Sequence, residues 1–184
     1  RDNLELVRYL LTQGASPSQP IIYKVREKPE DRPQSFSTPL HWAAMTGNLK
    51  MAEELIAAGA DALARDSEGR TPLHVTGALI PRNPAWSNDP QAKRYREGRP
   101  DAAKVDQEEI ASLLIRQEFY LINAVDVQGK TPLISAAAHG SLPVVRALLR
   151  RGADINQKDS NGKTALNHAL WHQDLAKFLI AEGS

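Results

Sequence analysis

One four-residue phrase, Thr-Pro-Leu-His or a close variant of it, occurs four times in this chain. The spacing of the copies limits the possible folds more than any other feature does. The copies begin at Thr38, Thr71, Thr131 and Thr164. The first two copies are 33 residues apart and so are the last two, whereas the middle two are 60 apart, which is one 33-residue period plus 27 further residues. A fixed period of this size indicates a repeat architecture, in which stacked units bury one continuous core.

The unit that begins at Thr131 predicts two helices followed by a hairpin. Threonine is a good N-cap residue, and Pro132 suits the first helical position, where a missing N–H costs nothing. A second helix is expected over 142–151, because apolar residues recur there at helical spacing and Gly152 can adopt the left-handed conformation that ends a helix. The turn-rich stretch 159–162 then favours a β-hairpin.

The same order of elements recurs along the chain, and it resembles the ankyrin repeat. The resemblance is carried by Thr-Pro-Leu-His at 38–41 and 71–74, Gly-Ala-Asp at 59–61 and 152–154, and the Asp-x-x-Gly turns at 66–69 and 159–162. It covers the whole chain apart from two insertions. The resemblance implies an all-α solenoid of stacked helix pairs with short β-hairpin fingers.

We expect a single domain over 1–184, divided as follows. Residues 1–14 are the second helix of a partial repeat, 15–37 are an extended hairpin insert, and repeats occupy 38–70, 71–130, 131–163 and 164–184, with a second insert at about 81–107. The inserts hold eight of the twelve prolines, which predicts loops. Because the helix at 1–14 lacks its companion, it exposes an apolar face, and the array is expected to continue on the N-terminal side.

Phe119, Tyr120 and Leu121 stand where the other units have Gly-Ala-Asp, so this helix end has gained apolar bulk. Two interpretations stay open. The three side chains either pack beneath the second insert or form an exposed binding patch.

Composition and motifs exclude several classes of protein. There is no cysteine, which excludes disulfides and thiolate metal sites. The net charge of +1 gives no reason to expect nucleic acid or a membrane as partner, and no apolar run approaches the ~18 residues of a membrane span. The chain contains no Gly-rich phosphate loop, nucleophile elbow or His-Glu-x-x-His motif. We therefore expect no enzyme activity and no cofactor.

The histidines invite a chemical interpretation, which the repeat argues against. The resemblance implies that His41 and His74 are structural and hydrogen-bond between adjacent loops. His168 and His172 have the i, i+4 spacing that can hold a metal, but only Asp174 stands nearby as a third ligand. We expect no metal site.

The resemblance implies a protein–protein interaction module that binds through its concave groove, finger tips and inserted loops. The finger-tip positions are Arg65, Ser67, Glu68, Arg70, Val127, Gln128, Lys130, Lys158, Ser160, Asn161 and Lys163. The first-helix positions are Met45, Thr46, Leu79, His139, Trp171 and His172, and the second insert adds Trp86, Arg94, Tyr95 and Arg96.

These fingers carry five basic residues against one acidic residue, Glu68, outside the turn aspartates. A basic rim favours a partner protein with an acidic surface, although a basic residue before the Thr is ordinary in such repeats. We expect a monomer in isolation. Two alternatives stay open, namely a dedicated inhibitor or self-protection protein that blocks a partner enzyme, and a substrate-recruiting domain of a larger enzyme. The chain begins at Arg1 rather than methionine, so we expect a trimmed piece and leave its compartment open, with a cytoplasmic location slightly favoured.

Overall fold

A computed structural model describes residues 3–23, 35–78 and 102–183. Along the chain these residues form α1 (Asn3–Thr12), β1 (Ile21–Tyr23), β2 (Ser35–Ser37), α2 (Pro39–Thr46), α3 (Leu49–Ala57), α4 (Pro72–Val75), α7 (Ala102–Gln117), the 3-10 helix η1 (Phe119–Asn123), α8 (Pro132–Ala138), α9 (Leu142–Arg150), α10 (Ala165–His168) and α11 (Gln173–Glu182). The described elements are almost entirely helical.

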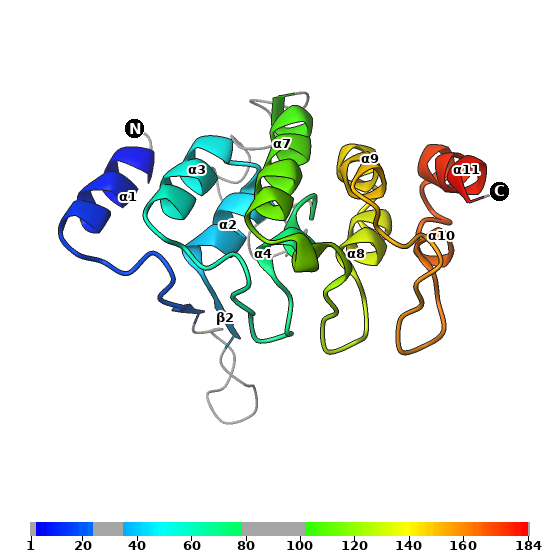
Figure 1. The fold of residues 1–184 in the computed structure, drawn as a ribbon, viewed down its shortest axis with the longest axis horizontal. Coiled ribbons are helices and arrows are strands. Elements are labelled where there is room, and N and C mark those ends of the chain that lie inside the picture. The colour runs from blue at the N-terminus through cyan, green and yellow to red at the C-terminus, as the bar shows by residue number, and fades with distance from the viewer. Residues whose placement is uncertain (1–2, 24–34, 79–101, 184) are drawn as a thin grey trace, which may run out of the picture.

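The helices form two rows that run the length of the molecule (Figure 1). The longer helices α1, α3, α7, α9 and α11 lie side by side in one row, which we call the second-helix row. The short helices α2, α4, α8 and α10 form the first-helix row, and loops project from one edge below them (Figure 1). This arrangement confirms the predicted all-α solenoid of stacked helix pairs.

Each first helix begins at the Thr of the repeated phrase because local hydrogen bonds cap it there. The backbone N–H of Thr38 donates to Nδ1 of His41 at 3.2 Å, and that of Thr71 donates to Nδ1 of His74 at 3.2 Å. Asn167 takes the same role in the fourth unit, where its Oδ1 accepts from the N–H of Thr164 at 2.9 Å. These bonds satisfy donors that a helix start would otherwise leave unpaired.

The core lies between the two rows. Leu40, Leu73 and Leu133, the leucines of the first three phrases, are fully buried. Alanines at the ends of the first helices, such as Ala44 and Ala137, are also fully buried and let neighbouring units approach closely. The repeated phrase therefore supplies both the helix start and the core contact of each unit.

Helix α1 packs on the N-terminal side of α3, with Leu4 and Val7 against the core. Leu6 and Leu10 on the same helix are 57% and 45% exposed. Their equivalents in the next unit, Met51 and Leu55, are buried against α2. The apolar face that the sequence predicts for the helix at 1–14 is thus exposed.

The segment 15–37, for which we expect an extended hairpin, contains the two paired strands of the described residues. Strands β1 and β2 pair antiparallel, with Ile21 opposite Ser37 and Tyr23 opposite Ser35. In the equivalent segments of the later repeats, 65–70, 125–130 and 158–163, a single tight turn takes the place of the two strands.

The structure moves one predicted boundary. We placed the second insert at about 81–107, but α7 already begins at Ala102 and extends over 16 residues. Residues 102–104 are Ala-Ala-Lys, all strong helix formers, and Gln107 is buried, with its Oε1 accepting from Oγ of Ser141 at 3.3 Å. The end of the insert therefore belongs to a helix that packs against α9.

The structure also decides between the two interpretations of residues 119–121. Leu121 is buried, whereas Phe119 and Tyr120 are 66% and 83% exposed. Packing beneath the second insert is thus wrong for the two aromatic residues. The two apolar residues at the centre of this 3-10 helix, Leu121 and Ile122, are buried, and the two rings at its start lie on the surface.

Candidate protein-binding surface

Three turns project from the first-helix edge and are held in the same way. They are finger 1 (65–70), finger 2 (125–130) and finger 3 (158–163). In each finger one aspartate oxygen, from Asp66, Asp126 or Asp159, accepts two backbone N–H bonds at 2.8–2.9 Å. The aspartates are therefore committed to shaping the turns.

Backbone hydrogen bonds join consecutive fingers into a ladder. The N–H of Val127 donates to the carbonyl oxygen of Glu68 at 3.1 Å, and the N–H of Ser160 donates to that of Gln128 at 3.0 Å. Glycine is needed here, because a Cβ on Gly129 would lie 2.9 Å from the nitrogen of Ser160. The ladder fixes the spacing of the finger side chains.

Buried histidines hold the base of two fingers. Nε2 of His41 donates to the carbonyl oxygen of Arg70 at 2.8 Å, and Nε2 of His74 donates to that of Lys130 at 3.0 Å. Burial lowers the pKa of both rings, for His74 to about 4, so both are neutral at pH 7. Their role is the structural one that the resemblance implies.

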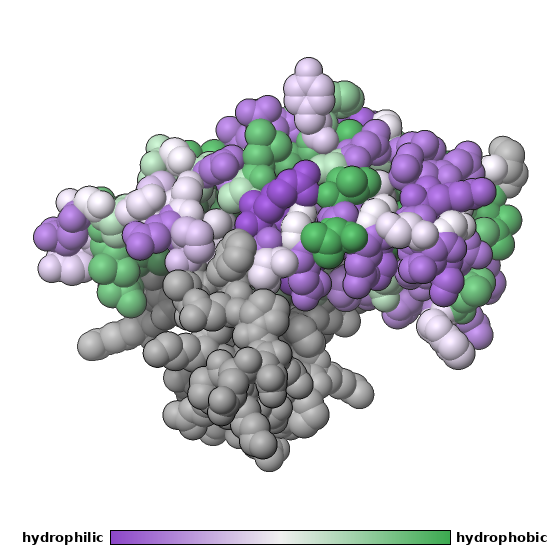
Figure 2. Space-filling model, turned by 90° about the horizontal axis from the view of Figure 1, so that it is seen from below, coloured by the Kyte–Doolittle hydropathy of each residue, from purple (hydrophilic) through white to green (hydrophobic). Residues whose placement is uncertain are grey.

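Among the described residues, most of the finger cations have no carboxylate partner. Arg70 forms ion pairs with Asp66 at 2.8 Å and Glu68 at 3.2 Å, while Arg65 donates to the carbonyl oxygens of Gly69 and Val125. Within 3–23, 35–78 and 102–183, no carboxylate pairs with Arg65, Lys130, Lys158 or Lys163. Hydrophilic residues predominate among the described residues visible in the view from below, with a few apolar residues between them (Figure 2).

The remaining predicted finger residues lie on the surface. Ser67, Glu68, Val127, Gln128, Lys158, Ser160, Asn161 and Lys163 are all exposed, and Arg70 and Lys130 are half-buried. Finger side chains of both chemical kinds, apolar Val127 and the lysines, are therefore accessible to a partner.

The predicted first-helix positions divide into two groups. Trp171 is 91% exposed, and His139 is also exposed. Met45 and Thr46 are half-buried, because Met45 packs against the core and Oγ1 of Thr46 donates to the carbonyl oxygen of Trp42 at 2.8 Å. Leu79, Trp86, Arg94, Tyr95 and Arg96 lie outside the described residues. The accessible part of this row is therefore at the α8–α10 end.

The two histidines with metal-ligand spacing point to different partners. Nε2 of His168 lies 2.8 Å from Oδ2 of Asp159, and Nε2 of His172 lies 3.3 Å from the carbonyl oxygen of Ala138. The pKa of Asp159 is lowered, first by the backbone N–H of Lys163 and then by His168. Over the described ranges, no group of three or more His, Cys, Asp or Glu could hold a metal ion. Sequence reasoning missed the His168–Asp159 pair, which joins residues only nine positions apart.

A comparison with family models identifies the repeat. The model described as ankyrin repeats (3 copies) matches residues 1–76 and 101–184. This chain belongs to the ankyrin-repeat family. Ankyrin repeats are generally protein–protein interaction modules, which gives the exposed fingers a functional context.

Several curated proteins are similar to this ankyrin-repeat chain. The protein named palmitoyltransferase ZDHHC13 of Danio rerio is 34% identical over 72% of this chain and 22% of its own length. The B-cell lymphoma 3 protein homolog of Mus musculus is 34% identical over 72% of this chain and 32% of its own length. The ankyrin repeat protein FPV230 of Fowlpox virus is 29% identical over 91% of this chain and 87% of its own length. The chain thus spans a third or less of the first two relatives.

No helix among the described residues is both long and apolar enough to cross a membrane.

Proposed function

We propose that this ankyrin-repeat domain is a non-catalytic module that binds a partner protein with an acidic surface through fingers 1 to 3 and the exposed end of the first-helix row. The observation that carries the proposal is the division of charge in the fingers. Asp66, Asp126 and Asp159 are spent on turn hydrogen bonds, whereas Lys158 and Lys163 are exposed. A partner therefore meets a positive edge.

Trp171 supplies an apolar anchor at the other end of α10, which it follows and finger 3 precedes. Its side chain is 91% exposed. This placement is unusual for a large ring, because moving such a ring out of water lowers the free energy. Aromatic residues of this kind dominate many interfaces, where truncation to alanine costs about 2 kcal/mol or more. Charge brings the acidic partner to the edge, and Trp171 holds it there.

The test begins with affinity capture of the partner from the native source by the intact protein. The dissociation constant is then measured for Lys158→Glu/Lys163→Glu and for the matched control Lys50→Glu/Lys177→Glu, whose lysines are exposed on α3 and α11 of the second-helix row. Both variants change the net charge equally. We expect a loss of about tenfold or more only for the finger variant, because rim charges act locally. Equal losses in the two variants would contradict the proposal.

A second candidate is the substrate-recruiting domain of a larger enzyme. It is favoured by the relatives of which this chain matches a minor part, one of them named a palmitoyltransferase. The full-length open reading frame distinguishes it, because recruitment requires a catalytic domain in the same chain. If the chain is instead a dedicated inhibitor, we expect the chain alone to lower the enzymatic activity of the captured partner.

A further inference from the structure

The contact that joins neighbouring fingers occurs twice with the same geometry. In finger 1 the carbonyl oxygen of Glu68, the residue before the turn glycine, accepts from the N–H of Val127 at 3.1 Å. In finger 2 the carbonyl oxygen of Gln128, again the residue before the glycine, accepts from the N–H of Ser160 at 3.0 Å. Each of these fingers thus offers one carbonyl oxygen to the finger that follows it.

The turn glycine leaves space for the backbone that donates this bond. A Cβ on Gly69 would lie 3.2 Å from the nitrogen of Val127, and a Cβ on Gly129 would lie 2.9 Å from the nitrogen of Ser160. Both distances are shorter than an ordinary van der Waals contact, so a side chain at either glycine would push the next finger away. A finger therefore receives its neighbour through two features, a carbonyl oxygen and a glycine beside it.

Finger 3 has both features and lies at the end of the row of fingers (Figure 1). The carbonyl oxygen of Asn161 corresponds to those of Glu68 and Gln128, but no donor from 3–23, 35–78 or 102–183 reaches it. Gly162 has the left-handed backbone of the other turn glycines, with φ of 74°. Nothing in the described structure lies within 4 Å of a Cβ placed on it. Finger 3 therefore exposes the receiving position that the first two fingers use.

The sixth residue after the repeated Thr bears on what can fit here. It is Ala44, Gly77 and Ala137 in the first three units but Leu170 in the fourth. In the second unit this position faces the next unit, since a Cβ on Gly77 would lie 2.7 Å from the Cβ of Ser141. Leu170 is larger than its equivalents and 64% exposed, so it opposes the close approach of another helix pair. An extended segment, which contacts the finger alone, avoids this clash.

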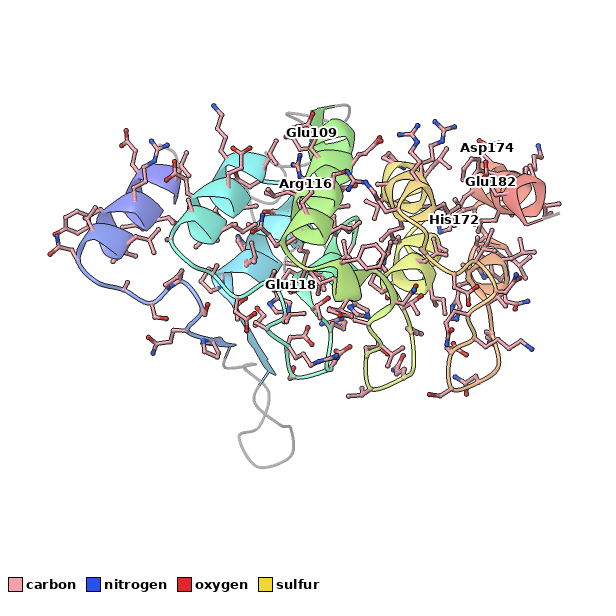
Figure 3. All side chains as sticks on the ribbon, in the orientation of Figure 1. Glu109, Arg116, Glu118, His172, Asp174 and Glu182 are labelled. Atoms are coloured by element: carbon pink, nitrogen blue, oxygen red, sulfur yellow. The ribbon has the colours of Figure 1, made fainter. Side chains whose placement is uncertain are left out.

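The charges around finger 3 favour an acidic segment. Lys158 and Lys163 flank the turn, are exposed and form no ion pair within the described part of the chain. Asp159 between them accepts the backbone bonds of the turn. Asp174 and Glu182 of the same unit come from α11 in the second-helix row, on the far side of the unit from the finger (Figure 3). A cation thus precedes and another follows the exposed carbonyl oxygen.

We propose that an extended acidic segment of the partner protein continues the finger ladder on finger 3. One of its backbone N–H groups donates to the carbonyl oxygen of Asn161, its chain passes over Gly162, and its carboxylates pair with Lys158 and Lys163. The main-chain bond supplies affinity, as when a peptide adds a strand to the edge of a sheet, and the lysines select an acidic segment. The inference rests on the proposed function, because it names the part of the acidic partner that the fingers recognise.

The experiment uses the intact chain and two acetylated heptapeptides of sequence Glu-Asp-Val-Val-Val-Asp-Glu, whose valines favour extended backbone. In the second peptide every backbone nitrogen is methylated, so it keeps all carboxylates but has no backbone donor. NMR titration follows the ¹³C shift of the Asn161 carbonyl group and gives both dissociation constants. We expect the unmethylated peptide to shift this carbonyl signal and to bind about fivefold or more tightly than the methylated one.

Gly162→Ala and Gly152→Ala form a matched pair of variants. The two glycines have φ of 74° and 87°, and neither has an atom within 4 Å of an added Cβ, so the variants carry similar strain. Only Gly162 lies on a finger, where the geometry of Gly129 and Ser160 puts an added Cβ 2.9 Å from the incoming nitrogen. We expect Gly162→Ala to bind the unmethylated peptide about fivefold or more weakly, and Gly152→Ala to bind it within about twofold of the original chain.

Equal binding of the two peptides, or normal peptide binding by Gly162→Ala, would show that the ladder is not extended. Sedimentation of the chain alone adds a second check, because a dimer that Gly162→Ala dissociates would mean that a second copy takes this position instead. A captured partner whose affinity depends on Trp171 and the finger lysines but not on Gly162 would overturn this inference alone and leave the proposed function standing. Affinity that depends on none of these residues would overturn both.

Discussion

Nε2 of His74 lies 3.0 Å from the carbonyl oxygen of Lys130, although the two residues are 56 positions apart. The equivalent bond from His41 to Arg70 spans only 29 positions. The longer separation contains the second insert, yet the bond to the finger is the same. Finger 2 therefore keeps its place despite the insert, because His74 ties it to α4, the first helix of the same repeat.

This buried bond predicts a pH dependence of stability. The pKa of His74 is about 4 in the folded chain, against 6.5 for a solvent-exposed imidazole, the state that the ring approaches in the unfolded chain. Between these values the unfolded chain binds more protons, so the stabilising contribution is complete above pH 6.5 and is lost as pH falls toward 4. We expect a loss of roughly 3 kcal/mol in the free energy of unfolding, measured by urea titration at several pH values. His74→Asn should flatten this slope, and an unchanged slope would contradict the assignment.

The finger glycines give a matched pair of substitutions. Gly129 and Gly162 both have a left-handed backbone, with φ of 71° and 74°. A Cβ on Gly129 would collide with Ser160, whereas nothing lies within 4 Å of the same position on Gly162. Both alanine variants should lose roughly 1 kcal/mol from the strained φ. Gly129→Ala should lose about 1–3 kcal/mol more from overpacking, measured by urea unfolding. Equal losses would mean that the contact between fingers 2 and 3 is not tight.

The unpaired finger cations predict a salt dependence of partner binding. Lys158 and Lys163 are exposed, and salt at 0.5 M screens such charges within a few Å. We expect the association rate constant with the captured partner to fall by at least about tenfold between 0.05 and 0.5 M salt, while the dissociation rate changes little. Stopped-flow or surface-binding kinetics measure both rates. An association rate independent of salt would rule out an acidic partner surface.

Much of the fold could be predicted because its signals are local. Thr38 and His41 lie three positions apart, and their capping bonds form within one helical turn. The start of α7 was not predicted, although the helix formers at 102–104 are a local signal for it. Helix formation there is supported by the contact of Gln107 with Ser141, which is 34 positions away.

The candidate site was predictable by position but not by exposure. The repeat pattern assigns Met45 and Trp171 to equivalent surface positions, yet Met45 packs against the core and Trp171 is 91% exposed. The side chains that surround each position decide this difference, and the pattern does not contain them. The same is true of Tyr120, which is exposed although its neighbour Leu121 is buried.

Tyr120 and Trp171 make the most direct comparison for the binding surface. Both rings are more than four-fifths exposed, at 83% and 91%, but Trp171 ends the first-helix row and Tyr120 follows a helix of the second-helix row. The decisive measurement is the dissociation constant of the captured partner for Trp171→Ala and Tyr120→Ala, with thermal unfolding of both variants as the control. Binding through the fingers and the first-helix row predicts that only Trp171→Ala weakens affinity, by about thirtyfold or about 2 kcal/mol. Normal binding by Trp171→Ala, or a loss confined to Tyr120→Ala, would contradict it.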